Sequence, residues 1–240
     1  MPRSPIWRSI ADSLTAEIAQ GAYAPGAKLP TEAELARRFG VNRHTVRHAL
    51  SALAEAGLTH ARRGAGVFVT SRPTDYPLGR RVRFHQNVLD SGRTPSRQIT
   101  RLETCPASRQ DATALRLPPG ALVHVIEGIS RADDQPIAAF RSVFPADRFP
   151  GLLAAMADQT SVTAALSACG LSDYTRAQTR ITAKLADALL ALALHLPQGA
   201  PVLRSMALNV DAQGQPVEHG TTWFAGDRVT LTVAAEEGRV

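Results

Sequence analysis

Residues 43–51, RHTVRHALS, carry basic side chains at a spacing suited to binding a polyanion. Arg43 and Arg47 stand four positions apart, so on a helix they are neighbours on one surface, where two like charges repel each other. The stretch contains no acidic residue, whereas solvated helix faces usually mix both signs. Arginines at the start of a helix in the DNA major groove bind guanine through paired hydrogen bonds. We therefore interpret this surface as one that reads DNA; a solvated helix face is the alternative.

Two further groups of residues are suited to DNA contacts. Hydroxyl and amide side chains at helix starts, where backbone N–H groups also point outward, bind phosphate oxygens. Glycines in a tight turn let the backbone approach the duplex closely. The residues that we expect at the DNA are Thr31, Asn42, Arg43, His44, Thr45, Arg47, Arg62, Gly64 and Gly66.

Two short helices are needed to position the basic surface. Thr31 and Glu34 have the spacing of a capping box, which predicts a helix start, and Gly40 ends that helix. Asn42 caps the next helix, and Gly57 ends it. The inward positions of this second helix are apolar: Val46, Ala49, Leu50 and Leu53. Two helices separated by about three residues are typical of a helix-turn-helix.

A further helix and a β-hairpin flank this pair. Apolar residues recur every four positions in residues 4–20, which predicts an amphipathic helix. Residues 59–70, THARRGAGVFVT, predict two short strands joined by a turn at Gly64 and Gly66. A phosphate-binding glycine loop would need a helix after it, and here a strand follows. The N-terminal part is therefore predicted to be a winged helix-turn-helix.

The net charge of +6 is concentrated in the N-terminal third. Residues 1–72 hold 10 Lys and Arg against 5 Asp and Glu, whereas the remaining residues hold 17 against 16. Such an asymmetry favours a polyanionic partner for the first part of the chain. A coding bias is the alternative, because 25 of the 27 basic residues are Arg.

The composition disfavours several classes of protein. With 44% hydrophobic and 20% charged residues the chain is typical of soluble globular proteins. It has neither a secretion signal nor a run of about 18 apolar residues, so we expect a cytoplasmic protein without a membrane span. Cys105 and Cys169 form neither a disulfide framework nor a metal cluster. Three histidines without an acidic or cysteine partner at ligand spacing also predict no metal and no cofactor: His124, His195 and His219.

Beyond residue 70 the pattern changes to a mixed one. Residues 71–79, with two prolines, predict a linker, and the rest predicts an α+β domain with a largely antiparallel sheet. Strands are expected over residues 96–104, 121–131, 136–144, 173–183, 201–210 and 216–224, and helices over 82–91, 109–116, 161–168 and 185–195. The turns RADDQP (131–136) and DAQGQP (211–216) each separate a pair of strands, which hints at an internal duplication.

The stretch KLPTEAELARRFGVNRHTVRHALSALAEAGLTHARRGAGVFV resembles the DNA-binding domain of the GntR family of bacterial transcription regulators. The resemblance covers residues 6–70 and implies that Arg43, Arg47 and Gly66 read the operator. Ala33 stands where many members have an arginine, so one base contact is missing and the operator sequence stays open.

Residues 76–233 resemble the effector-binding domain of the HutC subfamily, which is similar in fold to chorismate lyase. The resemblance is carried by QPIAAFRSVFPADRFPGL and GQPVEHGTTWFAGDRVTL, and YPLGRRVRFHQNVLDSGRTPS is similar to regulators of phosphonate uptake and breakdown. We therefore expect a winged helix-turn-helix domain (1–70), a linker (71–79) and an effector-binding and dimerisation domain (80–240).

The resemblance implies a small and often anionic effector. An anion site needs arginines, hydroxyls and backbone donors that converge in a cleft. The residues that could converge are Arg131, Arg141, Ser142, Ser161, Thr163 and Arg176, joined by Glu218, which lies where relatives place an acid that contacts polar effectors. Each of them has a purely structural role as its alternative. Phe140 stands where many relatives have a glutamate, which disfavours a sugar with several hydroxyls.

Three functions fit these features. We favour a ligand-responsive transcription regulator, a repressor by the habit of the family, that binds a palindromic operator as a homodimer with half-sites about one helical turn apart. Its effector would be a phosphonate or phosphate ester, with a sugar phosphate or carboxylate as the alternative. The second function is a chorismate-lyase-like enzyme, although no catalytic constellation is visible and we expect no enzyme activity. The third is a constitutive DNA-binding protein whose C-terminal domain only dimerises.

Overall fold

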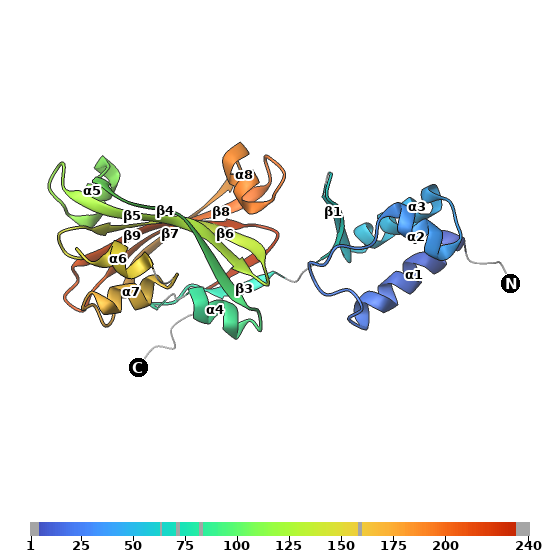
Figure 1. Cartoon of the computed structure of the whole chain (residues 1–240), viewed down its shortest axis with the longest axis horizontal. Coiled ribbons are helices and arrows are strands. Elements are labelled where there is room, and N and C mark those ends of the chain that lie inside the picture. The colour runs from blue at the N-terminus through green and yellow to red at the C-terminus, as the bar shows by residue number, and fades with distance from the viewer. Residues whose placement is uncertain (1–4, 63, 71–72, 82–83, 158–159, 234–240) are drawn as a thin grey trace. The chain divides into compact units, whose positions relative to one another are not determined.

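The computed structural model describes residues 5–62, 64–70, 73–81, 84–157 and 160–233. The chain divides into two compact units, residues 1–72 and residues 73–240 (Figure 1). None of the helices in the described ranges is long and apolar enough to cross a membrane.

The first unit has the predicted winged helix-turn-helix fold. In chain order it contains α1 (Ile6–Ala19), α2 (Glu32–Phe39), α3 (Arg43–Glu55), β1 (Thr59–Arg62) and β2 (Gly66–Val69). The two strands are antiparallel and form the wing. The apolar sides of the three helices meet in one core, in which Leu14, Leu35 and Val46 are fully buried. Burial of these apolar sides leaves the polar side of α3 facing solvent.

Side-chain caps fix where α2 and α3 begin. The capping box predicted at α2 is confirmed: Thr31 Oγ1 accepts a hydrogen bond from the N–H of Glu34, and the N–H of Thr31 donates to the Glu34 carboxylate at 2.7 Å. At α3, Asn42 Oδ1 accepts a hydrogen bond from the N–H of Thr45 at 2.8 Å. Because the caps satisfy backbone donors that a helix start leaves open, they set the first residue of each helix.

The second unit is built around a six-stranded antiparallel sheet with the strand order β4-β5-β6-β9-β8-β7. Its strands are β4 (Pro95–Pro106), β5 (Leu122–Ala132), β6 (Gln135–Pro145), β7 (Thr175–Leu185), β8 (Pro201–Val210) and β9 (Pro216–Ala225). The helices that the structure describes here are α4 (Phe84–Asp90), α5 (Arg109–Leu115), α6 (Leu152–Ala157), α7 (Val162–Ala168) and α8 (Ala188–Leu194). Figure 1 shows α5 and α8 on one face of the sheet and α4, α6 and α7 on the other. The expected α+β class with an antiparallel sheet is thus confirmed.

The topology supports the internal duplication. The segments β4-α5-β5-β6 and β7-α8-β8-β9 have the same order of elements and meet at the central strand pair β6–β9. Helices α5 and α8 both end at a residue with a left-handed backbone, Arg116 and His195. A glycine with φ close to +80° follows each of them, Gly120 in the first repeat and Gly199 in the second.

The linker predicted over residues 71–79 does not extend that far. Thr74–Pro77 form β3, which pairs in parallel with β10 (Val229–Thr232), and Tyr76 on β3 is only 6% exposed. The two strands come from opposite ends of the second unit, so no local pattern indicates their pairing. Residues 71 and 72 lie outside the described residues, and β3 follows them almost directly.

Candidate DNA interface and ligand pocket

The basic residues predicted to read DNA lie on the exposed side of α3. Arg43, His44 and Arg47 are exposed. The hydroxyl and amide side chains predicted beside them form hydrogen bonds within the two helix caps: Thr31, Asn42 and Thr45. These three side chains therefore have a structural role. The donors suited to phosphate oxygens here are the side-chain N–H groups of Asn42 and the nearby backbone N–H groups.

Arg47 is paired with an acid that belongs to a different helix. Its Nε donates to Oε1 of Glu32 at 2.9 Å, and its Nη2 donates to Oε2 at 2.8 Å. Glu32 is the first residue of α2, and the hydrogen bonds from Arg47 lower the pKa of its carboxyl. The sequence shows no acid on the basic stretch of α3, but the fold supplies one from α2. Arg43 has no ion pair within the described residues.

The wing brings a further basic residue to the candidate interface. Lys28 forms a β-bridge with Phe68 of β2, and its side chain crosses Gly66, where a Cβ atom would lie 2.7 Å from Lys28 Cε. Gly66 has φ +116° and Gly64 has φ +76°, so both adopt backbone conformations that favour glycine. Arg62 ends β1, but its side chain lies outside what the structure describes.

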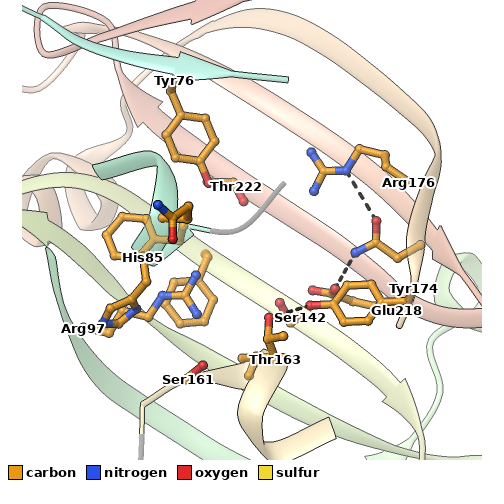
Figure 2. Close-up of a pocket in the computed structure, with 15 residues that line it drawn as sticks. Tyr76, His85, Arg97, Ser142, Ser161, Thr163, Tyr174, Arg176, Glu218 and Thr222 are labelled. Atoms are coloured by element: carbon orange, nitrogen blue, oxygen red, sulfur yellow. Dashed lines mark hydrogen bonds between the residues drawn. The ribbon is translucent and has the colours of Figure 1, made fainter. Parts of the chain in front are cut away.

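The second unit contains a pocket of about 250 Å³ on the face of the sheet that carries α4 and α7 (Figure 2). Five residues that the sequence nominated for an effector line it: Ser142, Ser161, Thr163, Arg176 and Glu218. The sequence did not nominate several others that line it, among them Tyr76, Phe84, His85, Arg97, Tyr174 and Asn209. The pocket therefore brings together side chains from both repeats and from β3.

Arg97 lines this pocket without a direct ion pair among the residues that the structure describes. Its guanidinium lies between two aromatic rings, with Cζ 4.7 Å from the ring centre of Phe84 and 4.8 Å from that of Phe140. Its Nε is buried without a hydrogen-bond partner, and it has no ion pair within the described residues. Burial lowers its pKa, although a guanidinium stays charged at neutral pH. Gly128 lies opposite Phe140 and leaves room for its ring, because a Cβ there would be 3.0 Å from ring atoms.

A hydrogen-bonded chain joins Arg176 to Glu218 through an amide. Nε of Arg176 donates to Oδ1 of Asn209 at 3.4 Å, and Nδ2 of Asn209 donates to Oε2 of Glu218 at 2.6 Å. Figure 2 shows Arg176 and Glu218 on the opposite side of the pocket from Arg97. The pocket thus presents cationic groups on two sides and one carboxylate.

Hydroxyl groups and neutral titratable groups complete the lining. Thr163 Oγ1 and the hydroxyl of Tyr174 form a hydrogen bond of 2.9 Å, and Ser161 caps α7 with its side chain. Burial raises the pKa of Tyr76. Burial, with the nearby charge of Arg97 in second place, lowers the pKa of His85. Neither group therefore carries charge near neutral pH.

Arg141 does not line the pocket, contrary to the prediction. It precedes Ser142 on β6, and successive side chains of a strand point to opposite faces of the sheet. On the other face its Nη2 donates to Oδ2 of Asp111 at 3.0 Å, and its Nε lies 3.5 Å from Oε1 of Glu127. Nδ1 of His219 lies 2.8 Å from the other oxygen of the Asp111 carboxylate. Arg141 is therefore part of a largely buried ionic cluster.

Arg131 does not line the pocket either. It lies at the β5–β6 hairpin, where its guanidinium donates to the backbone oxygen of Asp134 at 3.0 Å and to the side chain of Gln98 at 3.3 Å. In contrast, Arg97 and Tyr76 line the pocket although the sequence did not nominate them. Arg97 is one of two arginines on the edge strand β4, and no sequence pattern distinguishes it; Tyr76 lies in the stretch predicted as linker.

Comparison with known proteins identifies both units. The profile of the UTRA domain matches residues 90–230, and the profile described as bacterial regulatory proteins, gntR family, matches residues 7–69. The chain belongs to the GntR family. A relative from Escherichia coli K12, described as probable transcriptional regulator PhnF, is 34% identical over 237 residues, which cover 95% of this chain and 94% of that protein. This chain is thus a GntR-family transcription regulator with a UTRA domain.

Other relatives agree with this assignment. An uncharacterized HTH-type transcriptional regulator from Rhizobium meliloti is 40% identical to this regulator over 229 residues, covering 95% of this chain and 94% of that protein. The crystal structure of PhnF from Mycobacterium smegmatis matches 95% of this chain and all of that chain with a TM-score of 0.68 and 25% identity. These relatives and domains are those of transcription regulators and not of enzymes, so the chorismate-lyase-like alternative is not supported.

Proposed function

We propose that this regulator is a cytoplasmic homodimeric repressor that binds a palindromic operator through α3 and the wing. A small anion that enters the pocket of the second unit releases the operator. One recognition helix reads only a few base pairs, so two copies on half-sites about one helical turn apart are needed for a specific site. The exposed pair Arg43 and Arg47 supports base reading, and Lys28 at the wing supports contact with the phosphate backbone.

The observation that carries the anionic effector is Arg97. A half-buried guanidinium that forms no direct ion pair with a described residue loses part of its hydration, and a bound anion would compensate for that cost. Arg176 and the hydroxyls of Ser142 and Thr163 line the same pocket and can supply further hydrogen bonds. A phosphonate or phosphate ester suits these donors because its oxygens accept several charge-assisted hydrogen bonds. A carboxylate or a sugar phosphate is the alternative.

Exposed apolar side chains of the second unit support a homodimer. On β7 and α8, Leu185, Leu189 and Leu192 are 73–80% exposed, and Ile181 is 45% exposed. Large apolar side chains that gather on an exposed surface favour a protein contact there. We expect the full-length protein to elute as a dimer in size-exclusion chromatography with light scattering, and Leu189→Glu combined with Leu192→Glu to shift it toward monomer.

The path of the signal is proposed to run through β3. Tyr76 lines the pocket, and its strand begins at Thr74, close in sequence to the boundary between the two units. An effector that binds one arrangement of β3 better than another would shift the DNA-binding units between two states. Tyr76→Ala should therefore leave operator binding intact and weaken the response to the effector.

The test is operator release by defined ligands. The operator is selected from random duplexes with the full-length protein, and its affinity is measured by fluorescence anisotropy with phosphate, alkylphosphonates, phosphate esters and sugar phosphates. Anionic ligands should weaken operator binding by the wild type, and Arg97→Leu should remove the response without weakening operator binding. Indifference of the wild type to every ligand would favour the constitutive DNA-binding protein.

A further inference from the structure

Glu218 places a negative charge in a pocket that otherwise suits an anion. Its carboxylate is half-buried on β9 and lines the same cavity as Arg97 and Arg176 (Figure 2). In a partly desolvated site, like charges repel more strongly than in water. A ligand that is only anionic would therefore lose part of the attraction that the two arginines provide.

Within the described part of the chain, no basic side chain forms an ion pair with Glu218. Its Oε2 accepts the hydrogen bond from Asn209, and this amide lies between the carboxylate and the guanidinium of Arg176. Its Oε1 has no hydrogen-bond partner among the residues that the structure describes. The free oxygen therefore remains as an acceptor for a group that the ligand supplies.

We propose that the effector is dipolar, with a phosphoryl or phosphonyl group that binds Arg97 and an ammonium group that binds Oε1 of Glu218. This proposal rests on the proposed function of the pocket and specifies the chemical class of its ligand. An ammonium group donates up to three hydrogen bonds and forms charge-assisted bonds with a carboxylate. Tyr76 and Tyr174 also line the pocket, and aromatic rings attract cations.

The size of the pocket limits the chain between the two charged groups. A cavity of about 250 Å³ is smaller than a typical site for a drug-sized ligand, so we expect a spacer of only a few atoms. Short aminoalkylphosphonates and aminoalkyl phosphate esters both meet these requirements. Because both classes share the same charges, the experiment has to distinguish the carbon–phosphorus bond from the ester.

The first arm of the test compares ligands on the wild-type full-length protein by isothermal titration calorimetry. Ethylphosphonate and 2-aminoethylphosphonate form a matched pair that differs only in the ammonium group. We expect the ammonium to improve the affinity by about tenfold or more, as for a charge-assisted bond in a partly buried site. Phosphoethanolamine is the ester analogue of 2-aminoethylphosphonate. The ratio of their affinities shows whether the pocket prefers a phosphonate or a phosphate ester.

The second arm uses Glu218→Gln, whose side-chain oxygen can still accept the hydrogen bond from Asn209. This variant should bind 2-aminoethylphosphonate more weakly and ethylphosphonate more tightly than the wild type, so that the preference disappears. Glu127→Gln is the matched control, because Glu127 pairs with Arg101 and Arg141 outside the pocket. The control should keep the wild-type preference.

Two results would overturn the inference in distinguishable ways. If both phosphonates bind the wild type equally and Glu218→Gln changes neither affinity, the pocket binds an anion and the dipolar class is wrong. If neither phosphonate nor phosphoethanolamine binds, the anionic effector itself is wrong and the proposed function of the pocket fails with it.

Discussion

The guanidinium of Arg47 on α3 is held by both carboxylate oxygens of Glu32 on α2, at 2.9 Å and 2.8 Å. These bonds occupy one edge of the guanidinium and leave its Nη1 side available for a base edge. The pair fixes the orientation of a side chain that is otherwise exposed, 66% of its surface being accessible. The carboxylate would also repel DNA phosphates. Glu32 is therefore expected to orient Arg47 and to disfavour sequence-independent binding.

Replacement of Glu32 should reduce specificity more than affinity. In Glu32→Gln the negative charge is removed, so binding to a scrambled duplex should become tighter. The guanidinium of Arg47 is also less constrained in this variant. The affinity for the operator should therefore rise less than the affinity for the scrambled duplex. We expect the ratio of operator to scrambled affinity to fall by about tenfold, the size of one good base contact.

Fluorescence anisotropy with both duplexes at several salt concentrations measures this ratio. Glu17→Gln is the matched control, since Glu17 pairs with Arg38 between α1 and α2 and not with α3. An unchanged ratio in Glu32→Gln would show that the pair has no role in base reading.

Arg43→Ala and Arg47→Ala should each weaken operator binding by roughly tenfold to a hundredfold, the usual loss for a base-reading arginine. Both side chains are exposed, so the melting temperature should change little. Operator affinity and thermal unfolding, measured on the same preparations, check both expectations. A large drop in melting temperature together with normal operator binding would contradict the assignment of this surface.

Lys28→Gln tests the basic residue at the wing. A lysine that contacts phosphate contributes to all sequences alike, so operator and scrambled duplexes should be weakened by similar factors. The slope of log affinity against log salt concentration should become shallower by about one. If the slope is unchanged, Lys28 does not contact the phosphate backbone.

The buried cluster behind the sheet predicts a dependence of stability on pH. Burial acts to raise the pKa of Asp111, but hydrogen bonds from His219, Arg141 and Ser108 outweigh it and hold the pKa below its ordinary value. A carboxyl whose pKa is lower in the folded state stabilises the protein above its unfolded pKa. This stabilisation is lost as the pH falls through the folded value.

Asp111→Asn should therefore cost about 3 kcal/mol near neutral pH, because the half-buried guanidinium of Arg141 loses the carboxylate that pairs with it. The difference from the wild type should shrink below about pH 4, where the unfolded carboxyl takes up protons. Urea unfolding over a range of pH measures both quantities. Asp134→Asn, which alters an exposed carboxyl on a hairpin, serves as the control. A difference that does not vary with pH would show that the charge of Asp111 is not the cause.

Local patterns in the sequence determined most of the elements and the basic surface. The caps at Thr31 and Asn42 depend on residues three positions away, and the apolar periods follow from helix and strand geometry. These interactions join residues that are close together in the sequence, so the sequence alone predicts them. The winged helix-turn-helix, the six long strands and the exposure of Arg43 are of this kind.

Only the tertiary structure decided which charged side chains meet. It paired Arg47 with Glu32 across two helices and turned Arg141 away from the pocket toward Asp111. It also placed Arg97 of one edge strand in the pocket with Arg176 of the other. Each of these outcomes depends on strand register, on the alternation of faces and on contacts between distant segments. A linear pattern shows which side chains are present, but packing determines which charges are buried together.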